Sequence, residues 1–303
     1  MNELLKEDKD ISKVISYNNH YELDQSMLII PPHSEDYENI FVPKRFLENV
    51  ACHIIAPYLQ EDKQYKPPIY LAIKGLPGQG KTAQSIATCT QKGGCVIYVS
   101  ASTLSGSHEN EAKEKLQRIY NKAIELRTKV LTTIIIDDFH KGILNEDENI
   151  KKTINSDILT GYMMNIAEHN GSVHIPIILT ANDLSQIYAP LLRAGRADVF
   201  LWEPKQEEKR EIVFRIISSF LNDKNEKKFN SFFRRYNNEN IAFFAQLKNQ
   251  WRKVTLKDCI HDISDFNSEN IQKINNIINS YKYNLTYNML NDIAELLIKE
   301  RNE

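Results

Sequence analysis

Four short apolar runs in the first two thirds of the chain predict buried strands. They are IYLAI (69–73), GCVIYVS (94–100), LTTIII (131–136) and IPIILT (175–180). Between these runs the apolar residues recur at helical spacing, as in EAKEKLQRIYNKAIELR at 111–127. Strands that alternate with helices favour right-handed crossovers and a parallel sheet covered on both faces. The pattern therefore predicts an α/β domain built on a doubly wound parallel sheet.

The strand signal stops near residues 202–205. The stretches that follow are typical of amphipathic helices: EEKREIVFRIISSFL, KKFNSFFRRY, NIAFFAQLKNQWRKV and residues 268–301. Residues 1–40, in contrast, show no sustained period and contain the pair Pro31-Pro32. We predict an acidic N-terminal extension or linker over 1–40, the α/β domain over 41–204, and a smaller all-helical domain over 205–303.

The glycine-rich segment GLPGQGKT (75–82) lies between a predicted strand and a predicted helix. This context is the one in which the G-x-x-x-x-G-K-[ST] pattern forms a P-loop that binds ATP. Glycines allow backbone N–H groups to close around phosphates, and the helix N-terminus adds its positive dipole end. Lys81 is expected to reach the β- and γ-phosphates, and the Thr82 hydroxyl to bind Mg²⁺. The expected ATP-binding residues are Gly75, Pro77, Gly78, Gln79, Gly80, Lys81, Thr82 and Ala83.

Two acids follow the third apolar run, in IIIDDF (134–139). We expect Asp137, at the end of the strand, to hold Mg²⁺ through a coordinated water. Asp138 is the candidate that polarises the attacking water, because a general base must lie within hydrogen-bond reach of it. Aspartate is one methylene shorter than the glutamate usual at this place, so slow hydrolysis is one expectation. The alternative is that both acids only cap a turn or helix.

Asn182 and two arginines complete the set of candidate catalytic residues. Asn182, in ILTAND, follows the fourth apolar run, and ligand crevices of open α/β sheets lie outside such strand ends. Its amide could contact the γ-phosphate, although Asn-Asp is also common in turns. Arg193 and Arg196 flank a glycine in YAPLLRAGRADVF. Guanidinium groups suit a developing phosphoryl charge, and surface salt bridges are the alternative.

Composition excludes several other classes of protein. Hydrophobic residues make up 42% and charged residues 26%, which excludes disordered and fibrous chains. No apolar run approaches the roughly 20 residues that span a bilayer. The four cysteines include no CxxC pair, which argues against a zinc site or a disulfide framework. MNELLKEDKD does not resemble a signal peptide, so we expect a cytoplasmic protein without membrane partners.

Charge is unevenly distributed, although the net charge is only −2. Residues 1–40 hold nine acids and three bases, whereas residues 205–258 hold thirteen bases and seven acids. Such asymmetry can steer a charged partner or join neighbouring subunits. The alternative is that these charges only lie on helix faces that are exposed to solvent.

Several stretches together resemble the rubisco activases, a family of AAA+ ATPases. They are FVPKRFLENVACHI, GQGKT, IPIILTANDLSQIYAPLLRAGR, WEP and FFAQL, within residues 40–255. The resemblance implies a P-loop AAA+ domain with a helical lid, ATP and Mg²⁺ as cofactors, and a homo-oligomeric hexamer. It also implies that a protein client is remodelled through a central pore. Asn182 matches the first sensor, and Arg193 and Arg196 match arginines that reach the neighbouring subunit's nucleotide.

The resemblance also assigns two pore loops, at 103–109 and 142–152. Leu104 is then the expected client-gripping residue, with packing into the core as the alternative.

The chain departs from the family at several places. Lys248 and Gln250 stand where the family carries two lid arginines, so Lys248 is the candidate for the lid's contact with the γ-phosphate. An insertion that the plant enzymes carry before the fourth strand is missing, His140 replaces an acid, and the acidic N-terminal segment differs. Fold and ATPase activity transfer well by resemblance, but the client does not. Rubisco is therefore not favoured as the client.

Three hypotheses about function remain open at this point. The first is an ATP-driven remodeller of a protein. The second is a nucleotide-dependent switch that binds partner proteins or nucleic acid and hydrolyses ATP slowly. The third is a scaffold that binds ATP without turnover. The rate of phosphate release, measured with and without nucleic acid, separates them.

Overall fold

The computed structural model describes nine stretches of the chain. They are residues 26–59, 67–104, 110–139, 154–168, 174–185, 189–221, 223–260, 268–281 and 285–302. The chain forms two compact units. The first comprises the residues up to Leu76 together with Lys81–Glu203, and the second comprises Pro77–Gly80 and Pro204–Glu303.

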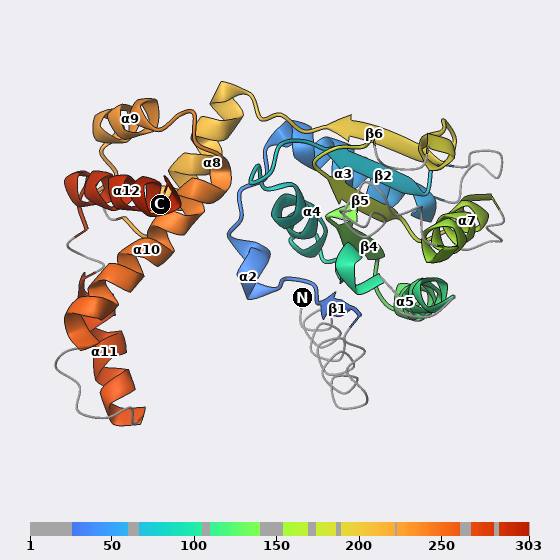
Figure 1. The fold of residues 1–303 in the computed structure, drawn as a ribbon, viewed down its shortest axis with the longest axis horizontal. Helices are drawn as coiled ribbons and strands as arrows, with labels where there is room; N and C mark the ends of the chain where they lie inside the picture. The colour runs from blue at the N-terminus through green and yellow to red at the C-terminus, as the bar shows by residue number, and fades with distance from the viewer. Residues whose placement is uncertain are drawn as a thin grey trace, which may run out of the picture. The chain divides into compact units, whose positions relative to one another are not determined.

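The first unit is built on a six-stranded sheet (Figure 1). Its strands are β1 (Leu28–Ile30), β2 (Tyr70–Lys74), β3 (Cys95–Ser100), β4 (Thr132–Asp137), β5 (Ile177–Ala181) and β6 (Ala197–Leu201). Their order across the sheet is β1-β3-β4-β5-β2-β6. β1 pairs antiparallel with β3, and all other pairs are parallel. The predicted doubly wound parallel sheet is thus confirmed, with one antiparallel strand added at its edge.

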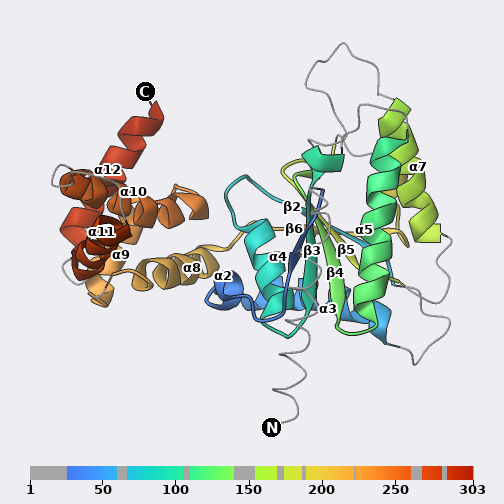
Figure 2. The ribbon, with the colours of Figure 1, turned by 90° about the horizontal axis from the view of Figure 1, so that it is seen from below.

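Helices cover both faces of this sheet. They are α2 (Glu35–Glu38), α3 (Lys44–Ile55), α4 (Lys81–Thr90), α5 (Glu111–Arg127) and α7 (Ile154–Glu168), with short turns η1 (Ala56–Tyr58), η2 (Ala101–Leu104) and η3 (Ala189–Leu192). α3 packs on α4, and α5 packs on α7. Figure 2 shows α4 on one side of the strands and α5 and α7 on the other.

Burial on both faces explains why the central strands are apolar at successive positions. On β4, Ile134 and Ile136 belong to the core cluster shared with α5 and α7. Ile135, which points to the opposite face because side chains alternate along a strand, is equally buried. The run of isoleucines therefore places β4 in the middle of the sheet, between β3 and β5.

The two edge strands, β1 and β6, were not among the four predicted strands. β1 has only three residues, which is too short to show a period, and it lies within the predicted 1–40 extension. On β6 the side chains of Asp198 and Val199 are both exposed. An edge strand has a neighbour on one side only, so its sequence need not be continuously apolar.

Among its described residues, the second unit contains helices and no strand. They are α8 (Gln206–Ser218), α9 (Glu226–Arg235), α10 (Ile241–Ile260), α11 (Ser268–Tyr281) and α12 (Tyr287–Asn302). The predicted all-helical region is thus confirmed as part of the fold. Aromatic side chains dominate its core: Phe229, Phe232, Phe233, Tyr236, Phe243, Phe244, Trp251 and Tyr287. Rings of this size bury large apolar areas and pack favourably edge to face.

Candidate nucleotide site

The glycine-rich turn follows β2 and leads directly into α4, which begins at Lys81. Gly78 and Gly80 have φ values of 73° and 76°, in the left-handed region that glycine adopts without strain. Gly75 has no room for a side chain, because a Cβ there would overlap the backbone oxygen of Trp202. Backbone shape and packing thus account for the glycines of the predicted P-loop.

The Lys81 ammonium lies at the carboxyl end of the sheet. Its Nζ donates to Gly75 O at 2.7 Å, to Leu76 O at 3.0 Å and to Asn182 Oδ1 at 2.9 Å. Burial lowers the pKa of Lys81, and the nearby carboxylates of Asp138 and Asp137 oppose that shift. The structure therefore brings together Lys81 and Asn182, which are 101 residues apart in the chain.

Asp137 accepts hydrogen bonds from three hydroxyl groups. Thr82 Oγ1 and Thr180 Oγ1 each donate to its Oδ1 at 2.5 Å, and the Tyr98 hydroxyl donates to its Oδ2 at 3.1 Å. Burial, together with the charge of Asp137, raises the pKa of Tyr98 to about 12. Both carboxylate oxygens are thereby held in one orientation.

Asp138 begins the turn after β4 with a left-handed backbone. Its φ is 53°, a value that few residues other than glycine adopt, although aspartate tolerates it. Its N–H donates to Thr180 Oγ1 at 3.2 Å. The side chain is half-buried beside the P-loop lysine, whose pKa it affects.

These residues fit a magnesium nucleotide. The left-handed glycines and the first turn of α4 present backbone N–H groups, which is the arrangement that binds phosphate. The Thr82 hydroxyl and the Asp137 carboxylate, 2.5 Å apart, are hard oxygen donors of the kind that Mg²⁺ prefers. Lys81 would supply the cation for the β- and γ-phosphates.

The comparisons with known proteins agree with this geometry. Residues 71–205 match the AAA family, described as "ATPase family associated with various cellular activities". Rubisco activase from Anabaena is 30% identical over 240 residues, which are 74% of this chain and 56% of that protein. Residues 71–205 thus form an AAA ATPase domain, and the chain is similar to the rubisco activases.

Other relatives are similar at the same level. The Nostoc rubisco activase is 28% identical over 238 residues, covering 74% of this chain and 56% of that protein. The chloroplast enzyme of Chlamydomonas reinhardtii is 28% identical over 185 residues, covering 57% of this chain and 45% of that protein. The chain thus spans about half the length of the curated relatives it matches. Among the described residues, no helix is long and apolar enough to cross a membrane.

The two arginines of this AAA+ protein lie in different surroundings. Arg193 is exposed after η3. Arg196 forms an ion pair with Glu168 on α7 and donates to Pro190 O at 2.6 Å. The salt-bridge alternative therefore describes the contacts that Arg196 makes within the chain, while a role at a neighbouring subunit's nucleotide stays a prediction.

The two lid positions that depart from the family lie on α10 of the second unit. Gln250 is buried and donates to Glu300 Oε2 at 3.1 Å. Lys248 is half-buried. The contact of Lys248 with the γ-phosphate remains a prediction.

The expected client contact at Leu104 is wrong for this conformation. Leu104 is 1% exposed and belongs to the core cluster of the first unit, because η2 turns it inward after β3. The alternative of core packing therefore holds. Residues 105–109 of the first predicted pore loop lie outside the described residues, as do all of 142–152 and His140.

Sequence reasoning missed Tyr98 and Thr180, the two further donors to Asp137. Thr180 was included in an apolar run, and Tyr98 was counted as a strand residue. A signal was present in the chain: both carry a hydroxyl near the carboxyl end of a strand that is otherwise largely apolar. Such hydroxyls meet at the same edge of a parallel sheet as the acids.

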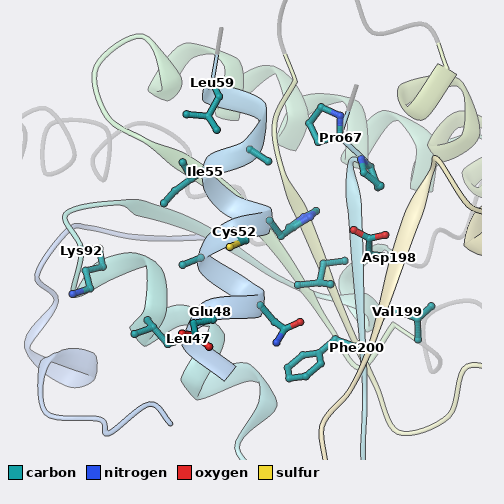
Figure 3. A pocket seen from close by; sticks show the side chains of 16 residues that line it. Leu47, Glu48, Cys52, Ile55, Leu59, Pro67, Lys92, Asp198, Val199 and Phe200 are labelled. Carbon is teal, nitrogen blue, oxygen red and sulfur yellow. The ribbon is translucent and has the colours of Figure 1, made fainter. Parts of the chain in front are cut away.

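A separate groove of about 1080 Å³ lies between α3 and the edge strand β6 (Figure 3). Ile55 and Cys52 on α3 and Phe200 and Asp198 on β6 are among its lining residues. None of its lining residues belongs to the P-loop or to the acidic end of β4.

Proposed function

We propose that this chain is a magnesium-dependent ATPase of the AAA+ type that remodels a protein client. The observation that carries the proposal is the meeting of four predicted groups at one end of the sheet. Lys81 Nζ is 2.9 Å from Asn182 Oδ1, and Thr82 Oγ1 is 2.5 Å from Asp137 Oδ1. These groups come from α4, β4 and the end of β5. A P-loop ATPase requires the lysine, the hydroxyl and the acid, and Asn182 is the expected first sensor.

Each residue has a role that follows from its chemistry. Lys81 would exchange its carbonyl partners for phosphate oxygens, and the Asn182 amide would contact the γ-phosphate. Thr82 and, through a coordinated water, Asp137 would hold Mg²⁺, which would neutralise phosphate charge. Asp138 orients the attacking water through its carboxylate.

The proposed assembly is a hexameric ring in the cytoplasm. In such a ring each interface is heterologous, so one subunit can reach the nucleotide of the next. The exposed side chain of Arg193 supports a contact between this arginine and the nucleotide of a neighbouring subunit. An arginine supplied in trans stabilises the charge of the transition state.

The test is phosphate release and ATP-induced thermal stabilisation, measured for the wild type and for Lys81→Ala. Stabilisation by a ligand grows with the logarithm of its free concentration relative to Kd and reaches about 2.7 kcal/mol at 100 times Kd. We expect Lys81→Ala to lose both signals. Lys209→Ala is the matched control, since Lys209 is also buried and its ammonium also donates to a backbone carbonyl, that of Asn237. Full ATP stabilisation in Lys81→Ala would place the phosphate site elsewhere.

A slow nucleotide switch is the second candidate, and the short side chain of Asp138 favours it. Aspartate reaches one methylene less far toward a water than glutamate does. The wild-type rate decides between the two, measured with protein lysate, with DNA or RNA, and alone. Stimulation by protein supports a remodeller, whereas a slow rate that rises only with nucleic acid supports the switch.

The client of the proposed remodeller is a protein, and rubisco is not the favoured one. The similar proteins are named rubisco activases. However, Gln250 and Lys248 differ from the family's lid residues, and Gln250 is engaged with Glu300. The test uses several forms of rubisco inhibited by a tight-binding sugar phosphate. Recovery of carboxylation with ATP that is lost in Lys81→Ala would identify rubisco as the client after all.

A further inference from the structure

The hydroxyl of Thr180 lies between the two acids of the site. Thr180 is fully buried on β5. Its Oγ1 donates to Asp137 Oδ1 at 2.5 Å and accepts the N–H of Asp138 at 3.2 Å. One hydroxyl therefore uses its hydrogen for the first acid and a lone pair for the second.

This link stands where the pairing of the two strands ends. The last paired residues of β4 and β5 are Ile136 and Leu179. Asp137 lies beyond that pair but still pairs with Ser100 of β3, and the chain turns away at Asp138, whose φ is 53°. A backbone in this region persists only when its surroundings hold it there. The Thr180 hydroxyl provides such a hold where the pairing between β4 and β5 ends.

We propose that Thr180 is a positioning residue that orients Asp137 for magnesium. The inference rests on the proposed nucleotide site. Asp137 Oδ1 faces Thr82 Oγ1, the other expected magnesium ligand, only while the carboxylate keeps its present rotamer. A valine methyl in place of the hydroxyl would remove one of the two hydroxyl donors of Asp137 Oδ1 and leave Thr82 as the other. Because losing a hydrogen bond to a charged acceptor is costly, the carboxylate would turn toward other donors and away from the metal position.

Thr133 offers a matched control on the same pair of strands. It is also fully buried, and its hydroxyl on β4 donates to Pro176 O, just before β5, at 2.9 Å. That bond lies at the opposite end of the strands from the two acids. Thr133→Val therefore removes a comparable buried hydroxyl bond without touching the site.

The experiment titrates Mg²⁺ and follows ATP-induced thermal stabilisation of the full chain. This readout needs binding only, not hydrolysis. For Thr180→Val we expect the magnesium midpoint to rise about tenfold, the factor that corresponds to losing one hydrogen bond to a charged group. Thr180→Ser keeps the hydroxyl and should stay within about twofold of the wild type, while Thr133→Val should leave the midpoint unchanged. Phosphate release at limiting Mg²⁺ should fall in Thr180→Val and recover when Mg²⁺ is raised.

An unchanged magnesium midpoint in Thr180→Val overturns the proposal, even if turnover falls. A midpoint raised equally in Thr180→Ser also overturns it, because the methyl group would then matter. If Thr180→Val does not fold, Thr180→Ala is compared with Thr180→Ser in the same way. A wild type that shows magnesium-dependent ATP binding but no phosphate release refutes the proposed ATPase alone, and the midpoints still decide the role of Thr180. A wild type without magnesium-dependent binding refutes both.

Discussion

The two units of the chain bury polar and apolar groups in contrasting ways. In the first unit, apolar strands carry polar groups at their carboxyl ends, where Lys81, Asp137, Thr180 and Asn182 satisfy one another through hydrogen bonds. In the second unit the core is a cluster of aromatic rings, such as Phe243 and Phe244, whose centroids are 5.3 Å apart. The polar site of the first unit depends on the hydrogen bonds of single atoms. The aromatic core of the second unit depends on contact area summed over many atoms.

This contrast indicates which quantity each substitution should change. Removing one polar atom at the sheet end should alter nucleotide chemistry more than stability. Removing a ring from the helical unit should alter stability, because it leaves a cavity that the neighbours fill only in part. Arg196→Ala and Phe244→Ala test this division directly. Two smaller expected effects then test what buried groups of the first unit contribute to its stability.

Arg196→Ala should lower turnover by about 10³-fold while ATP-induced stabilisation is kept, since an arginine at a neighbouring nucleotide acts on the transition state. Turnover and thermal shift are the measurements. Glu168→Gln is the control, because Glu168 is the ion-pair partner of Arg196 within the chain. Equal loss in Glu168→Gln would make Arg196 a structural residue of the first unit. Mixing Arg196→Ala with wild type should reduce activity more than in proportion; a strictly proportional loss would count against action in trans.

Phe244→Ala should destabilise the second unit by about 3–5 kcal/mol, the usual cost of deleting a buried aromatic ring. Phe244 is fully buried and contacts the rings of Phe232, Phe233 and Phe243. Urea unfolding gives the free energy of unfolding. Leu256→Ala on the same helix is the control, since Leu256 is 39% exposed and its loss should cost little. Similar costs for both variants would contradict the aromatic core.

Leu104→Ala should cost about 3 kcal/mol of stability, because it removes a buried leucine from the core of the first unit. Urea unfolding again gives the value, with the exposed Val199→Ala as control. A variant of wild-type stability that fails only in client remodelling would restore the client-gripping role. That result would also break the assignment of η2 to the core.

Acidification should weaken the first unit through His53 on α3. Burial lowers the pKa of His53 to about 4, although a hydrogen bond with the Ile177 backbone opposes the shift. The fold favours the neutral form of His53. The stability that this form contributes is therefore fully present above the unfolded pKa of about 6.5 and is lost as the pH falls toward 4. We expect a loss of about 2–3 kcal/mol over that window. Urea unfolding at several pH values should show this slope, and His53→Phe should remove it; an unchanged slope in His53→Phe would assign it to other groups.

Local pattern was sufficient for most of the fold. The apolar runs of β2 to β5 and the period of α5 are properties of neighbouring residues, and the structure has these elements close to their predicted places. The apolar pattern did not predict the edge strands β1 and β6, because a strand with a single neighbour needs neither length nor a continuous run of apolar residues. Leu104 was misjudged because a polar neighbourhood in the chain does not reveal which way one side chain turns.

The chemistry of the site divides in the same way. The P-loop glycines and the placement of Lys81 and Asp137 beside a strand and a helix follow from short segments, since local backbone geometry imposes them. The hydrogen-bond and ion-pair partners of the site residues do not follow from short segments. Thr180 reaches Asp137 across 43 residues, and Glu168 pairs with Arg196 across 28. Such contacts arise only when separate strands and helices pack side by side, so the orientation of Asp137 and the local partner of Arg196 had to be learned from the folded chain.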